Sequence, residues 1–385
     1  MRGAEDRRAC LLWATLAAAL AFAGQFITVH YNYRGNWTGL FCHGSRFPVP
    51  PALRAENVHV FANSDGFDGQ FYHFIAHDPF IKGDTPYYID APRLRYRRIL
   101  VPLLAWLLSA GGGRALHAAY LAVMLGFVWL GAWWLARSAV EQGTHPAWGL
   151  AFLAVPGTLI SLDRMTVDGP LAALAAGFAL YARAGPWWKL FLVLAAAPLV
   201  RETGLLFAAA CALYEIWQRR PHRAVFLAAG ALPALVWYGF VHSRLEGAGV
   251  VPLAAPFRGL IARLFAAARY RVGAPISDLA ATLDWISLAG ALVCFLLALH
   301  LIRAHRDVLV VAVALQLLLL STLNVYFWLD AYGYTRLFSP LLVLLAAGRW
   351  SLAWRWRWLP AGLMLPRVGL QLGGQLLGVL RGLLG

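Results

Sequence analysis

Charged residues are scarce in this sequence, and their scarcity excludes an ordinary soluble protein. They make up 13% of the 385 residues, whereas hydrophobic residues make up 61%. A typical soluble domain has about 25% charged residues. Apolar runs occur from Leu11 to Ala347, and nothing marks a separate soluble module. We therefore predict one continuous all-α helical bundle of a polytopic membrane protein.

Acidic residues are rarer than basic ones, with 18 against 33, which gives a net charge of +15. Such an excess can indicate a nucleic-acid partner. Here, however, the arginines lie in short clusters between apolar runs, where the positive-inside rule places them in cytoplasmic turns. We expect membrane orientation to explain the charge, and we predict no nucleic-acid partner.

Cysteine is also rare, since the chain has four, at Cys10, Cys42, Cys211 and Cys294. Their wide spacing predicts neither a disulfide framework nor a zinc site, so we expect them to be packing residues. The basic start followed by an apolar run at 11–29 is compatible with a signal peptide. Because a small-x-small cleavage site is weak, we interpret this run as a first span with a cytoplasmic start.

The lengths of the apolar runs predict about ten transmembrane helices, because a span needs about 20 apolar residues. Several apolar cores are shorter than this and reach the length of a span only if flanking residues are included. The run at 99–108 is too short to cross, so we expect it to be a helix at the membrane interface. The predicted span cores are 11–29, 115–136, 147–160, 170–182, 188–200, 203–217, 224–241, 279–302, 308–328 and 337–347.

This assignment divides the chain into a transmembrane domain, 1–348, with a large first outer loop at 30–114, and a C-terminal segment, 349–385. The C-terminal segment is either an interfacial helix or one more span. Arginines then fall in cytoplasmic turns, as the positive-inside rule demands. The loop 242–278 is the exception, since it holds five arginines on the outer side: either it binds anionic lipid head groups, or the topology is wrong there.

The same topology collects most other polar groups on the outer face. These are Asp65 and Asp68, the stretch from Asp163 to Asp168, Arg201 with Glu202, and the stretch from Asp330 to Arg336. They were not used to choose the topology, so their convergence independently indicates a functional site there. A crossing at 99–108 would reverse this arrangement.

The first outer loop is the strongest candidate for that site. Its core, 31–98, is far longer than an ordinary connection, so we expect it to be functional. Asp68 is followed by glycine and aromatic residues, and a carboxylate at the membrane surface is suited to act as a general base on a hydroxyl acceptor. Alternatively, Asp65 and Asp68 cap the next helix. Capping is the favoured role for Asp65, and the two roles are equally weighted for Asp68.

Four further residues carry charge near predicted spans. Arg201 is expected to bind a phosphate with Glu202 orienting it, although a structural ion pair between the two is the alternative. Asp163 either adds a second carboxylate that assists the base or holds a divalent cation, so a metal requirement stays open. For Asp168 we favour a helix cap, because Gly169 and a proline follow it.

Two further pairs of residues are candidates for ligand binding. Tyr334 and Arg336 suit a sugar face and a phosphate, or form an interfacial aromatic belt with a snorkelling arginine. His73 and His77 lie one helical turn apart and are able to bind a metal, but surface histidines are the more common interpretation. No cofactor is predicted with certainty, and a divalent cation is the one considered.

The motifs of the first loop resemble the GT-C superfamily of integral-membrane glycosyltransferases, in particular bacterial members with an Asp-Gly-Gln-Phe-Tyr loop. The matching residues are Asp68 to Tyr72 and the run Arg-Tyr-Arg-Arg-Ile-Leu at 95–100. Tyr96 and the run 102–108 are similar to the interfacial helix of GPI mannosyltransferases. Shorter matches lie at 201–204 and 334–340.

The resemblance implies a GT-C-like domain whose first outer loop holds the catalytic carboxylate at Asp68. It also implies a polyprenyl-phosphate-linked sugar that enters from the bilayer. Substrate contacts are then expected from Gln70, Tyr72, Arg95, Arg98, Arg201, Glu202, Tyr334 and Arg336. Asp65 and Asp68 are separated by two residues rather than the one of an Asp-x-Asp motif, which leaves metal-assisted chemistry and the choice of base between them open.

We therefore expect a glycosyltransferase that moves a hexose, by analogy mannose, to a hydroxyl acceptor on a glycan, lipid or protein. The expected location is the bacterial inner membrane, with the site on the periplasmic face and membrane lipids around it. Two alternatives are a transporter or flippase of a lipid-linked glycan and a non-catalytic partner in cell-envelope assembly. A transporter should show inverted repeats, which the sequence does not show clearly.

Overall fold

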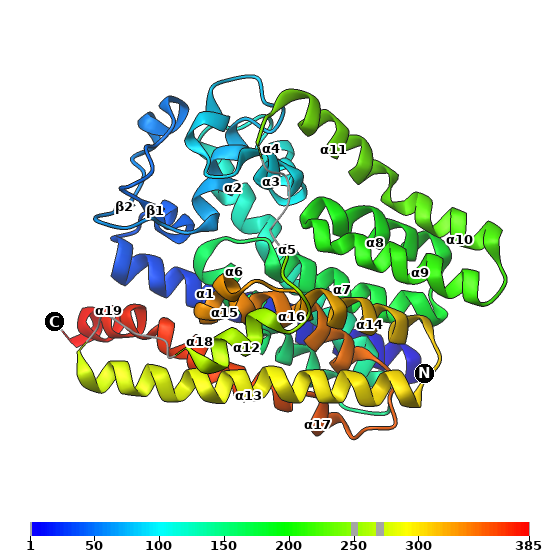
Figure 1. Cartoon of the computed structure of the whole chain (residues 1–385). Helices are drawn as coiled ribbons and strands as arrows, with labels where there is room; N and C mark the ends of the chain where they lie inside the picture. Colours follow the sequence, from blue (N-terminus) through cyan, green and yellow to red (C-terminus); the bar gives the residue numbers. More distant parts are fainter. Residues whose placement is uncertain (1, 248–252, 267–272, 385) are drawn as a thin grey trace.

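The computed structural model describes residues 2–247, 253–266 and 273–384, and helices dominate this part of the chain (Figure 1). The predicted all-α class is confirmed. The structure departs from this class in a pair of two-residue parallel strands, β1 (His43–Gly44) and β2 (Val60–Phe61), inside the first loop, and in an isolated antiparallel bridge between Leu253 and Leu323. Arg269 and Arg271, two of the five arginines in the predicted loop 242–278, lie outside the described residues.

The α-helices in chain order are α1 (Arg2–Tyr33), α2 (Asp68–His77), α3 (Pro92–Arg97), α4 (Leu100–Leu108), α5 (Leu116–Val140), α6 (Pro156–Arg164), α7 (Asp168–Ala184), α8 (Trp187–Val200), α9 (Leu205–Trp217), α10 (Pro221–Ala228), α11 (Leu232–Arg244), α12 (Arg258–Phe265), α13 (Ala274–Ala304), α14 (Val308–Ser321), α15 (Val325–Leu329), α16 (Ala331–Ala347), α17 (Trp354–Arg357), α18 (Leu359–Gln371) and α19 (Gly373–Leu384). Short 3-10 helices are η1 (Trp37–Phe41), η2 (Pro51–Glu56), η3 (Thr85–Tyr88), η4 (Gly113–Ala115), η5 (Pro146–Ala154), η6 (Glu202–Gly204) and η7 (Ala229–Ala231).

Helix lengths support fewer crossings than the ten predicted. Among the described residues, four helical stretches are long and apolar enough to cross a membrane, within 4–33, 116–140, 221–244 and 275–304, and the bent pairs η5–α6 and α18–α19 raise the number to six. Helices α8, α14 and α16 are apolar but have 14, 14 and 17 residues. The count of ten stays a prediction. Helix α4 has nine residues, too short to cross, as expected.

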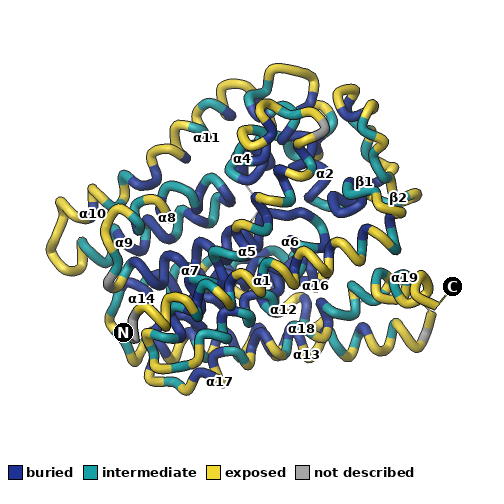
Figure 2. Tube along the Cα trace, turned by 180° about the vertical axis from the view of Figure 1, so that it is seen from behind, coloured by how far each residue is buried: buried dark blue, intermediate teal, exposed yellow. Residues whose placement is uncertain are grey.

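The buried centre of the molecule is formed by α5, α7 and α16. Helix α7 packs against both α5 and α16, and α1 also packs against α5. All residues of α16 except Arg336 are buried. Figure 2 shows this buried centre in dark blue, with exposed residues along α10 and α11. Arg336 is thus the one partly exposed residue of this helix, with 12% of its side chain exposed.

Four turns that carry or contact arginines lie close together at one end of the bundle. Arg183 lies 3.3 Å from Asp307, and Arg349 lies 2.8 Å from Glu141. Arg357 joins them through a hydrogen bond of 2.6 Å from its Nη1 atom to Oε1 of Gln142. The turns after α5, α7, α13 and α16 thus gather together.

The C-terminal segment does not stand apart from the bundle. Helix α18 packs along α13, and α19 packs against α1 after a bend of 55° (Figure 1). Arg367 of α18 donates to Asp284 of α13 at 2.7 Å, and Arg263 of α12 approaches the other oxygen at 3.1 Å. This buried group was not predicted, and it places Arg263 of the loop 242–278 inside the protein.

The four cysteines are free and buried, so their predicted role as packing residues is confirmed. Cys42 also accepts a hydrogen bond at its sulfur from Nη1 of Arg164, at 3.0 Å.

Candidate functional site

Asp68 is the first residue of α2, and the local chain explains why the helix begins there. Gly66 adopts a positive φ of 69°, which glycine tolerates, and Phe67 is extended. The Phe67 amide donates to the carbonyl of Cys42 at 3.0 Å. A Cβ atom at Gly69 would collide with the carbonyl oxygen of Arg164, so only glycine lets α2 approach α6 this closely. These contacts fix Asp68 in place.

Two guanidinium groups hold the Asp68 carboxylate. Nη2 of Arg95, from α3, lies 3.0 Å from Oδ1, and Nη1 of Arg336, from α16, lies 2.6 Å from Oδ2. Burial alone would raise the pKa of Asp68, but Arg336 and then Arg95 outweigh it and hold the pKa well below its usual range. Asp68 is therefore an ionised carboxylate.

A second buried carboxylate, Asp168, shares one of these arginines. Asp168 is the first residue of α7 and pairs with Nη1 of Arg201, at the junction of α8 and η6. Nη1 of Arg336 lies 3.7 Å from its other oxygen. Arg336 thus bridges Asp68 and Asp168, which brings together residues that are about 100 or more positions apart in the sequence.

A third pair joins the loop to the bundle. Nε and Nη2 of Arg98 donate to the two oxygens of Glu202 at 2.8 and 2.6 Å, a bidentate geometry that is both strong and directional. Nη1 of Arg98 donates to the Tyr72 hydroxyl at 3.0 Å. On the outer edge, Asp90 accepts two further hydrogen bonds from Arg95, at 3.0 and 2.9 Å.

We call this group the ion-pair cluster, and its members are Asp68, Arg95, Arg98, Asp168, Arg201, Glu202 and Arg336. It contains three carboxylates and four guanidinium groups, so it carries one excess positive charge before Asp90 is counted. The Nε atoms of Arg201 and Arg336 are buried and have no hydrogen-bond partner among the described residues. Because unmade hydrogen bonds of buried charged groups are costly, these donors suit an anionic ligand.

A cavity of about 420 Å³ opens beside the cluster. Its polar side includes Arg97, Arg201 and Glu202, together with Thr203 and Tyr238. Its other side is apolar and consists of Leu205, Leu206, Leu253, Leu319, Leu323, Phe327 and Leu337. The cavity can therefore hold a molecule with an anionic head and a hydrocarbon tail.

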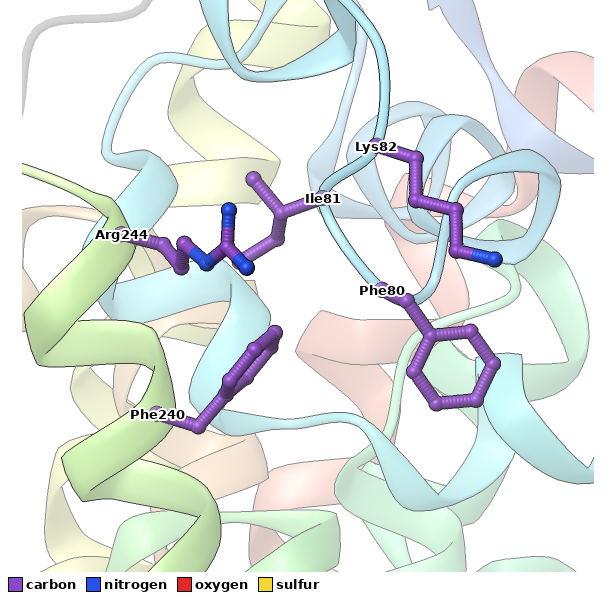
Figure 3. Close-up of a pocket in the computed structure, with 5 residues that line it drawn as sticks. All are labelled: Phe80, Ile81, Lys82, Phe240 and Arg244. Atoms are coloured by element: carbon purple, nitrogen blue, oxygen red, sulfur yellow. The ribbon is translucent and has the colours of Figure 1, made fainter.

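A wider cavity, of about 580 Å³, lies between the segment after α2 and helix α11. Figure 3 shows Phe240 and Arg244 of α11 facing Ile81, with Phe80 and Lys82 on the far side of the segment. None of the described residues that line this cavity carries a carboxylate. It lacks a group that takes a proton from an acceptor, so we place the candidate site at the ion-pair cluster.

Three predicted site residues lie elsewhere or play another part. Asp65 is 68% exposed at its side chain and pairs with Arg46 at 2.9 Å, so it neither joins the cluster nor caps α2. The Gln70 amide is buried: its Nε2 donates to the carbonyl of Asp65, and its Oε1 accepts from the amide of Gly44. These bonds make Gln70 a structural residue. The Tyr334 hydroxyl donates to Ser287 at 2.6 Å.

Asp163 lies on a neighbouring contact rather than in the cluster. Its carboxylate binds Arg164 at 3.0 Å, accepts from the Tyr332 hydroxyl at 3.2 Å, and bonds the Gln375 amide. Among the described residues, the His and carboxylate groups close enough to share a metal ion do not include it.

Two sequence-based expectations about pairing are wrong. Asp168 makes no capping hydrogen bond, because its carboxylate faces Arg201 instead. Glu202 pairs with Arg98 rather than with its neighbour Arg201. The role of Asp168 was missed, although an acid within an otherwise apolar stretch was the signal that could have revealed it.

The chain was compared with known proteins at the level of family models, curated sequences and solved structures, and nothing matches in any of the three comparisons. The function is therefore inferred from the site.

Proposed function

We propose that this protein is a GT-C-like glycosyltransferase that moves a hexose, with mannose as the guess by analogy, from a polyprenyl phosphate to a hydroxyl acceptor. The observation that carries this proposal is the ion-pair cluster beside a cavity with one cationic and one leucine-lined side. A phosphate and its isoprenoid chain have the chemistry of these two sides. A soluble sugar donor has no hydrocarbon chain that would fill the leucine-lined side of this cavity.

In the proposed reaction the donor phosphate binds near Arg201, whose unpartnered Nε atom supplies a hydrogen bond. The acceptor oxygen forms a bond to the anomeric carbon, and the bond between that carbon and the phosphate oxygen breaks with inversion. Polyprenyl phosphate leaves with the electron pair. Guanidinium groups fixed in advance around this oxygen stabilise its growing charge, which is the main help such a leaving group needs.

Asp68 takes the proton of the acceptor in this scheme. Each carboxylate oxygen has two lone pairs, so one is left on each after the contacts with Arg95 and Arg336. An arriving phosphate competes with Asp68 for Arg336, and a weaker contact raises the proton affinity of Asp68. Donor binding would then activate the base.

The membrane setting of the proposal is a multi-pass protein of the bacterial inner membrane. Among the described residues, four to six helical stretches are long and apolar enough to cross a membrane, which supports this setting. The turns with arginines that gather after α5, α7, α13 and α16 support it as well. With those turns in the cytoplasm, the ion-pair cluster faces the periplasm. The acceptor is then a periplasmic glycan, lipid or protein.

The experiment that tests this function is sugar transfer by the purified full-length protein in detergent. A panel of radiolabelled polyprenyl-phosphate hexoses is supplied with a hydroxyl acceptor, with and without EDTA to report any need for a divalent cation. We expect label to move to the acceptor. Absence of donor turnover, combined with movement of a lipid-linked glycan across liposomes, would contradict the proposal and favour the flippase alternative.

A further inference from the structure

A group of three histidines and one glutamate converges behind the first loop, away from the ion-pair cluster. Glu56 ends η2, His73 and His77 lie one turn apart on α2, and His117 is in the first turn of α5. One ligand atom from each of the four side chains lies within 4.8 Å of all the others. His73 is fully buried, and the other three side chains are 8–19% exposed.

The distances between these ligand atoms match the edges of a small tetrahedron. His73 Nε2 lies 2.9 Å from His117 Nε2 and 3.4 Å from His77 Nε2. Glu56 Oε2 lies 3.0, 3.3 and 3.7 Å from the Nε2 atoms of His117, His77 and His73. A tetrahedral zinc ion with bonds of about 2.0–2.1 Å requires edges of roughly 3.4 Å.

Hydrogen bonds alone do not account for the arrangement. A neutral imidazole nitrogen either donates one proton or accepts through one lone pair. His73 Nε2, however, faces three polar atoms, and His117 Nε2 faces both Glu56 and His73. All three rings point the same atom, Nε2, at one centre. A shared cation on which these lone pairs converge satisfies all of them together.

We propose that Glu56, His73, His77 and His117 bind one zinc ion through three Nε2 atoms and a carboxylate oxygen. Imidazole and carboxylate are ligands that zinc accepts, and four ligands complete its tetrahedral shell. The site is therefore closed and structural: it leaves no position for a substrate. This inference does not depend on the proposed transferase activity.

The surroundings of the site fit a bound metal. The second nitrogen of His73, Nδ1, lies 3.0 Å from Nε2 of His43 on β1, which supplies the outer hydrogen bond that orients a ligating histidine. The Phe41 ring stacks on His73 with centroids 4.1 Å apart and covers it. The ion would join η2, α2 and α5, and so hold the helix that begins at Asp68.

The test is metal content of the full-length protein, purified in detergent with any affinity tag removed. The protein is stripped with EDTA, reloaded with zinc chloride, desalted and measured by mass spectrometry of the metal. We expect about one zinc per chain in the wild type. Wild-type protein that retains no zinc after desalting would overturn the proposal without any mutation.

Variants separate this site from surface binding. His117→Gln and Glu56→Gln are chosen because their side chains are partly exposed, and His222→Gln on α10 is the control because His222 is exposed and outside the group. Zinc should raise the thermal midpoint of the wild type and of His222→Gln, but not of the other two. Zinc binding by His117→Gln and Glu56→Gln at the wild-type level would also overturn the proposal.

Discussion

At the scale of single residues, the ionisation of Asp68 has the most direct consequence. Because Arg336 and Arg95 lower its pKa in the folded protein, folding favours the ionised form. The stability from this charge is complete above the ordinary carboxyl value of 3.8 and is lost as the pH falls below it.

The matching prediction concerns the free energy of unfolding of the wild type and of Asp68→Asn. We expect the wild type to be more stable by about 3–5 kcal/mol near neutral pH, since removing one partner of a buried pair leaves uncompensated charge. The difference should shrink only below about pH 4. Denaturant titrations at several pH values check this, and a difference that instead vanished near pH 7 would contradict the assigned pKa direction.

The cavity arginine gives a second residue-scale prediction. Arg201→Lys keeps the charge but loses the planar fork that contacts Asp168 and offers Nε to a ligand. We expect kcat/KM for the lipid donor to fall roughly 10- to 100-fold, because a hydrogen bond to a charged group contributes about 1.5–3 kcal/mol. Arg46→Lys, at the exposed pair with Asp65, is the matched control and should leave the kinetics unchanged.

The sequence could identify the charged residues but not their partners. Arg201 was predicted because a charge in an apolar stretch is costly and conspicuous. Asp68 was predicted from its place in the long first loop and from the GT-C resemblance, and Arg336 from its place beside Tyr334. Neighbours such as Arg201 and Glu202 were expected to pair, yet the backbone at Arg201 is extended, and Arg201 pairs with Asp168 of α7 while Glu202 pairs with Arg98, which follows α3. Such choices depend on tertiary packing, which no local pattern encodes.

At the scale of elements, the contact between α2 and α6 sets the position of Asp68. Gly69→Ala would place a methyl group against the carbonyl of Arg164, so we expect a loss of about 1–3 kcal/mol and impaired transfer. Gly126→Ala in α5 meets nothing within 4 Å and serves as the control, with unchanged or slightly higher stability. Thermal unfolding of both variants tests this, and equal midpoints would refute the close approach.

The spacing of residues in the sequence predicted only part of the histidine group. The spacing of His73 and His77 predicted that a metal site was possible on one helix, but the surface interpretation was preferred. That interpretation is wrong, because His73 is fully buried and His77 nearly so. Glu56 and His117 join them from η2 and α5, and no spacing rule links residues 44 positions apart, as His73 and His117 are.

At the scale of the whole molecule, the turns with arginines after α5, α7, α13 and α16 and the ion-pair cluster are two separate charged regions of an otherwise apolar bundle. The helix type was predictable from the apolar runs. The number of membrane crossings was harder to predict, because α8, α14 and α16 are shorter than a full span. Helices packed inside a bundle need not cross the whole bilayer, and composition alone does not distinguish the two cases.

Sidedness can be measured by cysteine labelling with a membrane-impermeant maleimide. The four native cysteines are buried and should react little. Tyr87 is 87% exposed in the first loop, and Arg220 is exposed in the turn before α10. In intact cells we expect Tyr87→Cys to be labelled and Arg220→Cys to be labelled only after permeabilisation; the reverse pattern would invert the topology.

The most direct measurement is sugar transfer from polyprenyl-phosphate donors by Asp68→Asn beside Asp65→Asn, each purified and shown to be folded. Both changes remove one negative charge from the same loop, but only Asp68 belongs to the ion-pair cluster. We predict that Asp68→Asn loses transfer by at least 100-fold, the lower end of what a general base contributes, while Asp65→Asn transfers as the wild type does. Full transfer by folded Asp68→Asn would contradict the account, and loss in Asp65→Asn alone would move the base to Asp65.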